Sequence, residues 1–192
     1  MRVILREIVG LVLLAVVIFL LLQFMVPRFE VVGSSMEPNL HDGQRLLINK
    51  VVYFFREPEA GEVIVFQPPK NKRTDYIKRI IALPGDVVEI KSGVVYVNGS
   101  PLDEPFIKDQ PGYTLNPTEV PENDYFVLGD NRNNSNDSHN DWTVPRKNIV
   151  GKAWLSIWPP SLWGVVTNYP LREQLNDATP EQVAGVHVAL VD

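Results

Sequence analysis

The stretch YIKRIIALPGDVVEIKSGVVYVNG, residues 76–99, sets the fold class of this 192-residue chain. It contains three short runs rich in β-branched residues, separated by Leu-Pro-Gly-Asp and by Ser92-Gly93. Runs of this kind bounded by Gly, Pro, Asn and Asp predict strands, and glycine tolerates the positive φ that a tight hairpin turn needs. We therefore expect strands over 76–83, 86–91 and 94–98, the last two forming a hairpin.

The same pattern recurs along most of the chain and predicts a mainly β domain. Further strands are expected at Arg45–Asn49, Val51–Phe55, Glu62–Phe66, Asp124–Leu128 and Ile149–Trp158. The 16 prolines and 12 glycines lie mainly between these runs, which suits many strands with irregular connections. Residues 99–123 are rich in proline and are expected to form a surface excursion of the domain rather than a second core. In the tail, 171–192, Thr179-Pro180-Glu181-Gln182 has the pattern of a capping box and predicts a short helix.

A long apolar run precedes the β-rich part. Ile8–Val26 contains one polar residue, Gln23, and together with Pro27 spans 20 positions, which as a helix rise about 30 Å, the thickness of a bilayer's hydrocarbon core. A buried core helix rarely runs this long without a polar face, and the apolar region of a removable signal peptide has about 7 to 15 residues. A retained transmembrane anchor is therefore favoured over both alternatives.

The charges that flank this run predict its orientation. Arg2 and Arg6 precede it, which gives a slight positive-inside bias. We expect residues 1–27 to form a cytoplasmic stub and transmembrane anchor, and residues 28–170 to form an extracytoplasmic domain.

Charge and cysteine content exclude several classes of protein. The net charge is -5 and the Lys and Arg residues are scattered, so no basic stripe is available to neutralise phosphates. Nucleic acid is therefore not an expected partner. The chain has no cysteine, which excludes disulfides, thiolate catalysis and cysteine metal sites.

Two adjacent serines in GSSMEPNL, residues 33–40, are candidate nucleophiles. A serine hydroxyl needs a neighbouring base to accept its proton. The histidine candidates are His41, His139 and His187, and each is more typical of a surface residue than of a catalyst.

Lys78 is the other candidate base. On the expected strand it shares a face with the apolar residues Ile80 and Ala82, and burial would lower its pKa by penalising the ammonium. The alternative is a structural lysine whose aliphatic stem covers apolar surface. Arg79 is excluded as a base because guanidinium does not release its proton in proteins.

The third polar cluster is GDNRNNSNDSHNDW, residues 129–142. Its many Asn, Asp and Ser residues predict a loop held by bonds between side chains and backbone. A calcium loop is disfavoured because, counting from Asp130, position three is Arg132 and position six is Ser135 instead of glycine. The loop offers a hydroxyl that could orient a neutral lysine, and carboxylates that could pair with Arg79 or Arg132.

These segments together resemble a known family. An apolar N-terminal segment followed in order by GSSMEPNL, GEVIVFQPP, YIKRIIALPGD and GDNRNNSNDS is similar to bacterial type I signal peptidases, also called leader peptidases, the serine–lysine dyad proteases of peptidase family S26. The likeness runs from residue 1 to about residue 160.

The resemblance implies a fold, an activity and a place in the cell. The fold would be a coiled β-sheet catalytic domain of the signal-peptidase kind with one N-terminal transmembrane helix. The activity would be removal of signal peptides from exported preproteins, after small residues at positions -3 and -1, by an acyl-enzyme mechanism without a cofactor or metal. The enzyme would lie in the bacterial cytoplasmic membrane as a single-pass protein, bound to the lipid bilayer and near the secretion translocase.

Site residues follow from the same resemblance. Ser35, directly before Met36, matches the nucleophile, and Lys78 matches the general base. Ser135 matches a serine that hydrogen-bonds and positions that lysine, and Asp137 matches a carboxylate that helps hold the site. A structural ion pair is expected between Asp130 and Arg79. The walls of the substrate pockets are expected at Phe29, Val31, Val32, Met36, Leu40, Tyr76 and Ile77.

Two positions depart from the family pattern. Gly33 stands where some members have a serine that contributes to the oxyanion hole, so stabilisation would rest on the Ser35 backbone N–H and another donor. His139 stands where an arginine often pairs with the nearby aspartate. Because imidazole titrates near pH 6.5, a pair of His139 with Asp137 would make activity or stability sensitive to pH, which the variant His139→Arg tests.

Two other functions remain open at this level. A self-cleaving repressor-type protease uses the same pair of residue types but needs no membrane span, and its expected DNA-binding module is missing. A membrane-tethered binding module would use the polar loop only as structure. A serine-reactive acylating probe separates an enzyme from such a module.

Overall fold

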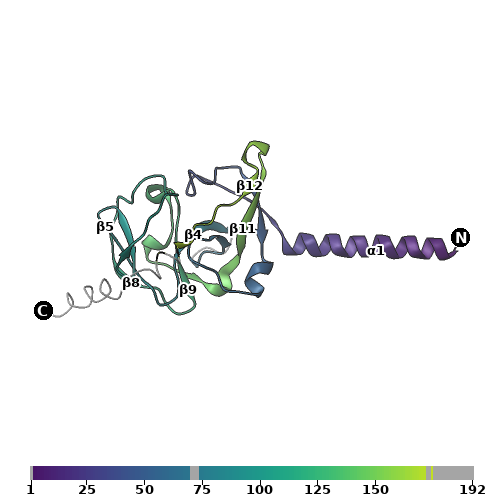
Figure 1. The fold of residues 1–192 in the computed structure, drawn as a ribbon, viewed down its shortest axis with the longest axis horizontal. Coiled ribbons are helices and arrows are strands. Elements are labelled where there is room, and N and C mark those ends of the chain that lie inside the picture. Colours follow the sequence, from purple (N-terminus) through teal and green to yellow (C-terminus); the bar gives the residue numbers. More distant parts are fainter. Residues whose placement is uncertain (1, 70–73, 172–173, 175–192) are drawn as a thin grey trace.

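The computed structural model describes residues 2–69, 74–171 and 174. Helix α1 (Arg2–Met25) extends away from a β-rich domain, with the N-terminus at its far end (Figure 1). Within the described residues, no helix meets the length and hydropathy needed to cross a membrane, so the predicted transmembrane span is not confirmed. The predicted tail helix lies outside the described residues.

The larger sheet carries most of the strands. It has eight strands in the order β1-β2-β11-β3-β4-β9-β10, with β12 pairing with β11, and every pairing is antiparallel. The bounds are β1 (Arg28–Glu30), β2 (Arg45–Asn49), β3 (Val63–Phe66), β4 (Tyr76–Ala82), β9 (Asp124–Leu128), β10 (Val144–Pro145), β11 (Ile149–Trp158) and β12 (Gly164–Val165). The prediction of a mainly β domain is confirmed.

The smaller sheet has four strands in the order β7-β6-β5-β8. Its strands are β5 (Val87–Lys91), β6 (Val94–Val97), β7 (Ser100–Pro101) and β8 (Leu115–Glu119). β5 and β6 form the predicted hairpin, because Ser92 has φ 51° and Gly93 has φ 79°, the two positive values that a tight hairpin turn requires.

Residues 99–123 are not only a surface excursion, so that prediction was wrong in part. Their strands β7 and β8 complete the smaller sheet, and Leu102, Phe106 and Val120 are buried in a cluster with the apolar side chains of β5 and β6. The prolines hid these strands because they interrupt the alternation by which short strands are recognised.

The strand predicted at Val51–Phe55 is also wrong. This segment forms the 3₁₀ helix η1 (Val51–Phe54), in which the Val52 N–H donates to the Asn49 side chain and the Phe55 N–H donates to Val52 O. Tyr53 is buried, but Phe54 and Phe55 are 77% and 84% exposed, so the apolar composition of the segment reflects burial only in part. The other 3₁₀ helices are η2 (Arg132–Asn134), η3 (Ser138–Asn140), η4 (Arg146–Asn148) and η5 (Pro160–Leu162).

Strand β4 contributes to all three apolar clusters of the domain. Ile77 belongs to the cluster under β1 and β2, Ile80 to the cluster with Phe66, and Ala82 to the cluster of the smaller sheet. A register shift between Ile80 and Ala82 moves Ala82 off the face that it was expected to share with Lys78. Packing on several sides fixes β4, and Lys78 with it, at the centre of the domain.

Candidate active site

Ser35 and Lys78 meet in the folded chain. Lys78 Nζ donates a hydrogen bond to Ser35 Oγ at 2.8 Å and another to its neighbour's carbonyl, Ile77 O, at 2.8 Å. Lys78 lies near the start of β4, whereas Ser35 lies in the turn that follows β1. The fold thus brings together two groups that lie 43 positions apart in the sequence.

Burial changes the proton affinity of Lys78. The side chain is only 4% exposed, and this desolvation lowers its pKa from 10.5 to about 8, although Asp137 and Asp130 act in the opposite direction. A lysine with this pKa is partly neutral at physiological pH, and its neutral amine has a lone pair that accepts a proton. Lys78 is therefore equipped to act as a base toward the hydroxyl that it contacts.

The polar loop after β9 holds the turn that carries the two serines. The Asn131 N–H donates to Ser35 O at 3.0 Å, and its Nδ2 donates to Ser34 O at 3.0 Å. Asn134 Nδ2 donates to Ser34 Oγ at 2.8 Å. The sequence indicated a loop knit by hydrogen bonds but did not single out Asn131 and Asn134 as the groups that contact the serine turn.

Gly129 packs directly against the turn that carries the two serines. A Cβ at position 129 would lie 2.3 Å from Ser135 Oγ and 2.5 Å from Ser35 O, both shorter than any allowed contact. In the sequence, this glycine stands out only as the start of the polar loop. Its role depends on contact with the turn at Ser35, which lies far away in the sequence, so no local sequence pattern reveals it.

Ser135 is close to the site but does not contact Lys78 as expected. Its Oγ is buried and has no hydrogen-bond partner among the described residues. The second hydrogen bond from Lys78 Nζ goes to Ile77 O instead. The hydrogen bond expected between Ser135 and Lys78 is therefore absent from this structure.

Asp137 anchors the far side of the loop. It is fully buried, and its carboxylate accepts hydrogen bonds from the Gly129 N–H at 2.9 Å and from the His139 N–H at 3.3 Å. His139 Nδ1 lies 2.7 Å from Asp137 Oδ1, and the ring stacks on Tyr113. The contact between His139 and Asp137 is an ion pair only while the imidazole is protonated. The predicted sensitivity of activity or stability to pH therefore stays a prediction.

Arg79 and Asp130 form a buried ion pair behind the site. Arg79 Nε and Nη2 donate to the two carboxylate oxygens at 2.9 and 2.7 Å, and both side chains are almost completely buried. Arg79 Nη1 also donates to Gly61 O at 2.9 Å. Arg132 pairs with Glu104 instead of with a carboxylate of its own loop. The Arg79–Asp130 pair ties β4 to the loop that holds the nucleophile turn.

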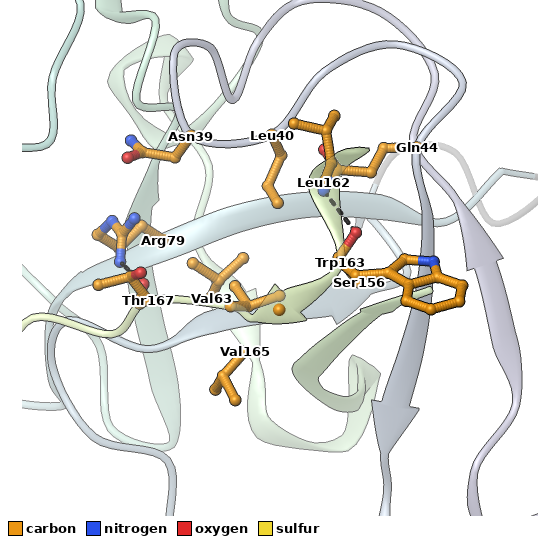
Figure 2. A pocket seen from close by; sticks show the side chains of 12 residues that line it. Asn39, Leu40, Gln44, Val63, Arg79, Ser156, Leu162, Trp163, Val165 and Thr167 are labelled. Atoms are coloured by element: carbon orange, nitrogen blue, oxygen red, sulfur yellow. Dashed lines mark hydrogen bonds between the residues drawn. The ribbon is translucent and has the colours of Figure 1, made fainter. Parts of the chain in front are cut away.

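A small cavity of about 210 Å³ lies beside Arg79 (Figure 2). Gln44 Nε2 donates to Ser156 Oγ at 2.8 Å on one side of it, and Arg79 donates to Thr167 O on another. Neither Ser35 nor Lys78 lines this cavity. Its wall includes the exposed residues Trp163 and Val165, so the cavity opens to the surface at a place that the two candidate catalytic side chains do not reach.

The dyad opens instead into a groove of about 620 Å³, which we call the active-site groove. Ser35 and Lys78 line it together with four of the predicted pocket residues, Phe29, Val32, Tyr76 and Ile77. The other three, Val31, Met36 and Leu40, do not line it and are buried in the cluster that also contains Ile77. That part of the pocket prediction is wrong for the groove surface, because these side chains point into the domain.

Two unpaired strand edges border the active-site groove. β1 lies at one end of the larger sheet and pairs only with β2. On β4, Tyr76, Ile77 and Lys78 pair with β3 on one side, whereas pairing with β9 begins only at Arg79. The backbone groups on these edges are available to an extended peptide placed between them.

Comparisons with known proteins were consistent with one another. A family model described as "Signal peptidase, peptidase S26" matches residues 4–158. The chain is 42% identical over 183 residues to "Probable signal peptidase I-1" of Synechocystis sp., covering 89% of this chain and 93% of that protein. It is 36% identical over 174 residues to "Signal peptidase IB" of Staphylococcus aureus, covering 81% and 90%. A solved signal peptidase I from Enterococcus faecalis shares 31% identity with a TM-score of 0.42, covering 50% of this chain and 97% of that one.

Proposed function

Because the chain belongs to the signal peptidase family, peptidase S26, and is a serine endopeptidase, we propose that it removes signal peptides from exported preproteins with Ser35 as nucleophile and Lys78 as general base. One observation carries the choice of residues. Lys78 Nζ is buried and lies 2.8 Å from Ser35 Oγ, with its pKa lowered to about 8. A desolvated amine in hydrogen-bond contact with a hydroxyl is the arrangement that activates a serine.

The reaction proceeds by acyl transfer. Neutral Lys78 takes the proton of Ser35 as Oγ attacks the carbonyl carbon of the scissile bond, which gives a tetrahedral oxyanion. The lysine then passes this proton to the departing amine as the C–N bond breaks, leaving the acyl group on Ser35. A water molecule attacks the ester while Lys78 accepts its proton and returns it to Oγ, which releases the signal peptide.

The oxyanion needs donors at the site where its charge forms. Among the described residues, the Ser35 N–H donates to no other group, which leaves it for the substrate oxygen. Gly33 supplies no side-chain donor, so the remaining stabilisation comes from a further donor such as a water molecule.

Ser135 and Asp137 hold the base in this proposal. No hydrogen bond joins Ser135 to Lys78 in this structure, so the unpartnered Ser135 hydroxyl would bond to the lysine only after one of the two side chains shifts during the reaction. Asp137 keeps the loop that carries Ser135 in place. A buried hydroxyl without a partner costs stability, so its retention next to the nucleophile turn supports a role in the reaction.

Specificity arises in the active-site groove. An extended substrate bonded to the edges of β1 and β4 places alternate side chains on the same face. Positions -1 and -3 then both face the groove walls Phe29, Val32, Tyr76 and Ile77. In this proposal those walls select for small side chains at the two positions. The buried residues Val31, Met36 and Leu40 support these walls from beneath.

We assign α1 to the lipid phase, as a single-pass anchor with its N-terminus in the cytoplasm and the catalytic domain on the other side. Its apolar side chains are exposed on all sides of the helix, for example Leu11, Leu13 and Phe19. Exposed apolar surface of this extent needs a cover, and a bilayer provides one. An anchor also confines the enzyme to the surface on which signal peptides emerge, near the secretion translocase.

Three single substitutions test the assignment of the dyad. Ser35→Ala and Lys78→Ala should each lower preprotein cleavage by about a thousandfold or more while leaving the fold intact. Ser34→Ala is the matched control and should stay largely active, because Ser34 Oγ bonds only to Asn134. Cleavage would be followed with purified enzyme in detergent, and folding by circular dichroism.

A serine-reactive acylating probe separates this proposal from a membrane-tethered binding module. Labelling should require both Ser35 and Lys78. Near-wild-type turnover in Lys78→Ala would refute the dyad, and a loss in Ser34→Ala as large as in Ser35→Ala would reopen the choice of nucleophile.

A further inference from the structure

A second groove lies where α1 joins the domain. It is about 630 Å³ in volume and is lined by Phe19, Gln23, Val26, Pro27, Arg28, Leu47 and Trp154. We call it the α1 crevice. Apart from Gln23 and Arg28 its lining is apolar, and its volume is typical of ligand-binding clefts. The reaction at Ser35 and Lys78 uses none of these residues.

Strand pairing in the larger sheet positions the residues on one wall of the α1 crevice. Arg28 of β1 pairs with Leu47 of β2, and Leu47 pairs with Leu155 of β11. Trp154 sits at the register shift next to Leu155 and is 44% exposed. A large aromatic side chain is thereby left at the surface beside α1, where only the last turns of the helix face it.

The α1 crevice adjoins the active-site groove at Arg28. Arg28 lines both, and β1 runs from the crevice toward the turn that holds Ser35. Ser35 follows Arg28 by seven positions. Only Arg28–Glu30 of this segment is extended, and residues 33–40 turn back. An extended peptide that lies alongside β1 with its cleaved bond at Ser35 therefore reaches the crevice with residues that precede that bond.

The direction of the substrate follows from α1. In a signal peptide, an apolar segment of about 7 to 15 residues precedes the cleavage site. If α1 and this segment occupy the same lipid layer, the substrate must run in the same direction as the enzyme's own chain, from α1 along β1 to Ser35. The start of the cleavage region then lies at Arg28, and the end of the apolar segment lies against Phe19, Leu47 and Trp154.

We infer that the α1 crevice binds the end of the signal peptide's apolar segment, an inference that rests on the proposed function. Apolar side chains of the substrate pack on Trp154 and Phe19. Gln23 and Arg28 face the polar residues of the substrate that follow its apolar segment. Binding energy gained far from the reacting bond positions that bond against Ser35. The α1 crevice thus selects substrates by the segment before the cleavage region, which the active-site groove does not contact.

The test compares two substrates on the full-length enzyme in detergent. One is a preprotein with its whole signal peptide, and the other is a peptide that covers the cleavage region without the apolar segment. In Trp154→Ala, the ratio of kcat/KM for the preprotein to kcat/KM for the short peptide should fall by about tenfold, the scale of losing one anchoring aromatic side chain. Trp158→Ala is the matched control, because Trp158 lies on the same strand, is 51% exposed and lines neither groove.

A second variant, on α1, tests the crevice without changing a residue of β11. Phe19→Ala removes an aromatic ring from the α1 side of the crevice, and the ratio should fall as in Trp154→Ala, whereas Leu20→Ala, on the next position of the helix, should keep the wild-type ratio. An unchanged ratio in both Trp154→Ala and Phe19→Ala would overturn the inference.

Cross-linking identifies what fills the α1 crevice. A photoreactive leucine at the end of the preprotein's apolar segment should cross-link, in the Ser35→Ala enzyme, to the peptides that contain Phe19, Leu47 or Trp154. Cross-links only to lipid, or to a second copy of the enzyme at these positions, would also overturn the inference. If the wild-type enzyme cleaved neither substrate, the proposed function itself would fail.

Discussion

The proposed role of Lys78 as general base predicts how activity responds to pH. Because burial lowers its pKa to about 8, about a tenth of the lysine is neutral at pH 7 and about nine-tenths at pH 9. Only the neutral form accepts the proton of Ser35, so kcat/KM for an uncharged peptide should rise about tenfold over this range and then level off. A rise that continues unchanged beyond pH 10 would show that the lysine titrates as it does in water.

The same shift affects stability with a defined sign. The folded pKa of Lys78 is below its ordinary value of 10.5, so the unfolded chain binds more protons between about pH 8 and 10.5. Through this residue the free energy of unfolding rises with pH across that window. Below about pH 8 the buried ammonium lowers the free energy of unfolding by a constant amount, a cost that the proposed catalytic role of Lys78 would explain.

Gly129 is predicted to tolerate no side chain. In Gly129→Ala the new methyl group would overlap Ser135 Oγ and Ser35 O, so either the loop or the nucleophile turn must move. We expect preprotein cleavage to fall by about a hundredfold or more, because a displacement of about 1 Å is enough to misplace a nucleophile. Gly112→Ala is a suitable control in the same enzyme, since its nearest contact is the side chain of Asn133. Wild-type cleavage in Gly129→Ala would mean that this loop adapts freely.

The elements around the dyad are tied together by charge as well as by packing. Arg79 and Asp130 join β4 to the loop after β9, and both are buried. Asp130→Asn should lower the free energy of unfolding by about 3–5 kcal/mol, because it leaves the guanidinium buried without a counter-charge. Adding Arg79→Met should recover a large part of this loss, as measured by thermal or denaturant unfolding. The single variant Arg79→Met completes the comparison. If the loss of unfolding free energy in the double variant equalled the sum of the losses in Asp130→Asn and Arg79→Met, the two side chains would not be coupled.

Local elements were predictable where a few adjacent residues decide the conformation. The β5–β6 hairpin follows from Ser92-Gly93, and β2, β9 and β11 have the predicted bounds. Segment 51–55 was misassigned because β-branched and aromatic residues favour strands only when neighbouring strands cover them, and here Phe54 and Phe55 remain exposed. The three-residue strand β1 carries too short a pattern to be recognised from the sequence.

The site was predictable only through the resemblance of its motifs. Composition alone left Lys78 as one of several candidate bases, because its value as a base depends on burial by side chains distant in the sequence. The contacts of Asn131 and Gly129 with the serine turn span more than 90 positions. Such contacts arise from the topology of the sheet, which a single sequence does not display.

On the scale of the whole molecule, α1 and the domain are predicted to lie in different media. In inverted and right-side-out vesicles, a protease should reach the catalytic domain from one side and a tag on the N-terminus from the other. Full-length enzyme should also remain in the membrane after extraction with carbonate at high pH, because the apolar side chains of α1 prefer hydrocarbon. Access to the tag and the domain from the same side would instead place α1 along the surface of the bilayer.

The two unpaired strand edges of the active-site groove have a consequence for turnover. In the proposed binding mode they bond to the main chain of the substrate, and the severed signal peptide keeps all of the main chain that lies before the broken bond. The severed signal peptide should therefore compete with uncleaved preprotein for the active-site groove. Release of this product into the surrounding lipid, rather than bond breaking, would then limit the rate at saturating substrate. By the same logic, a short strand mimic with a small residue at its end is a natural template for an inhibitor.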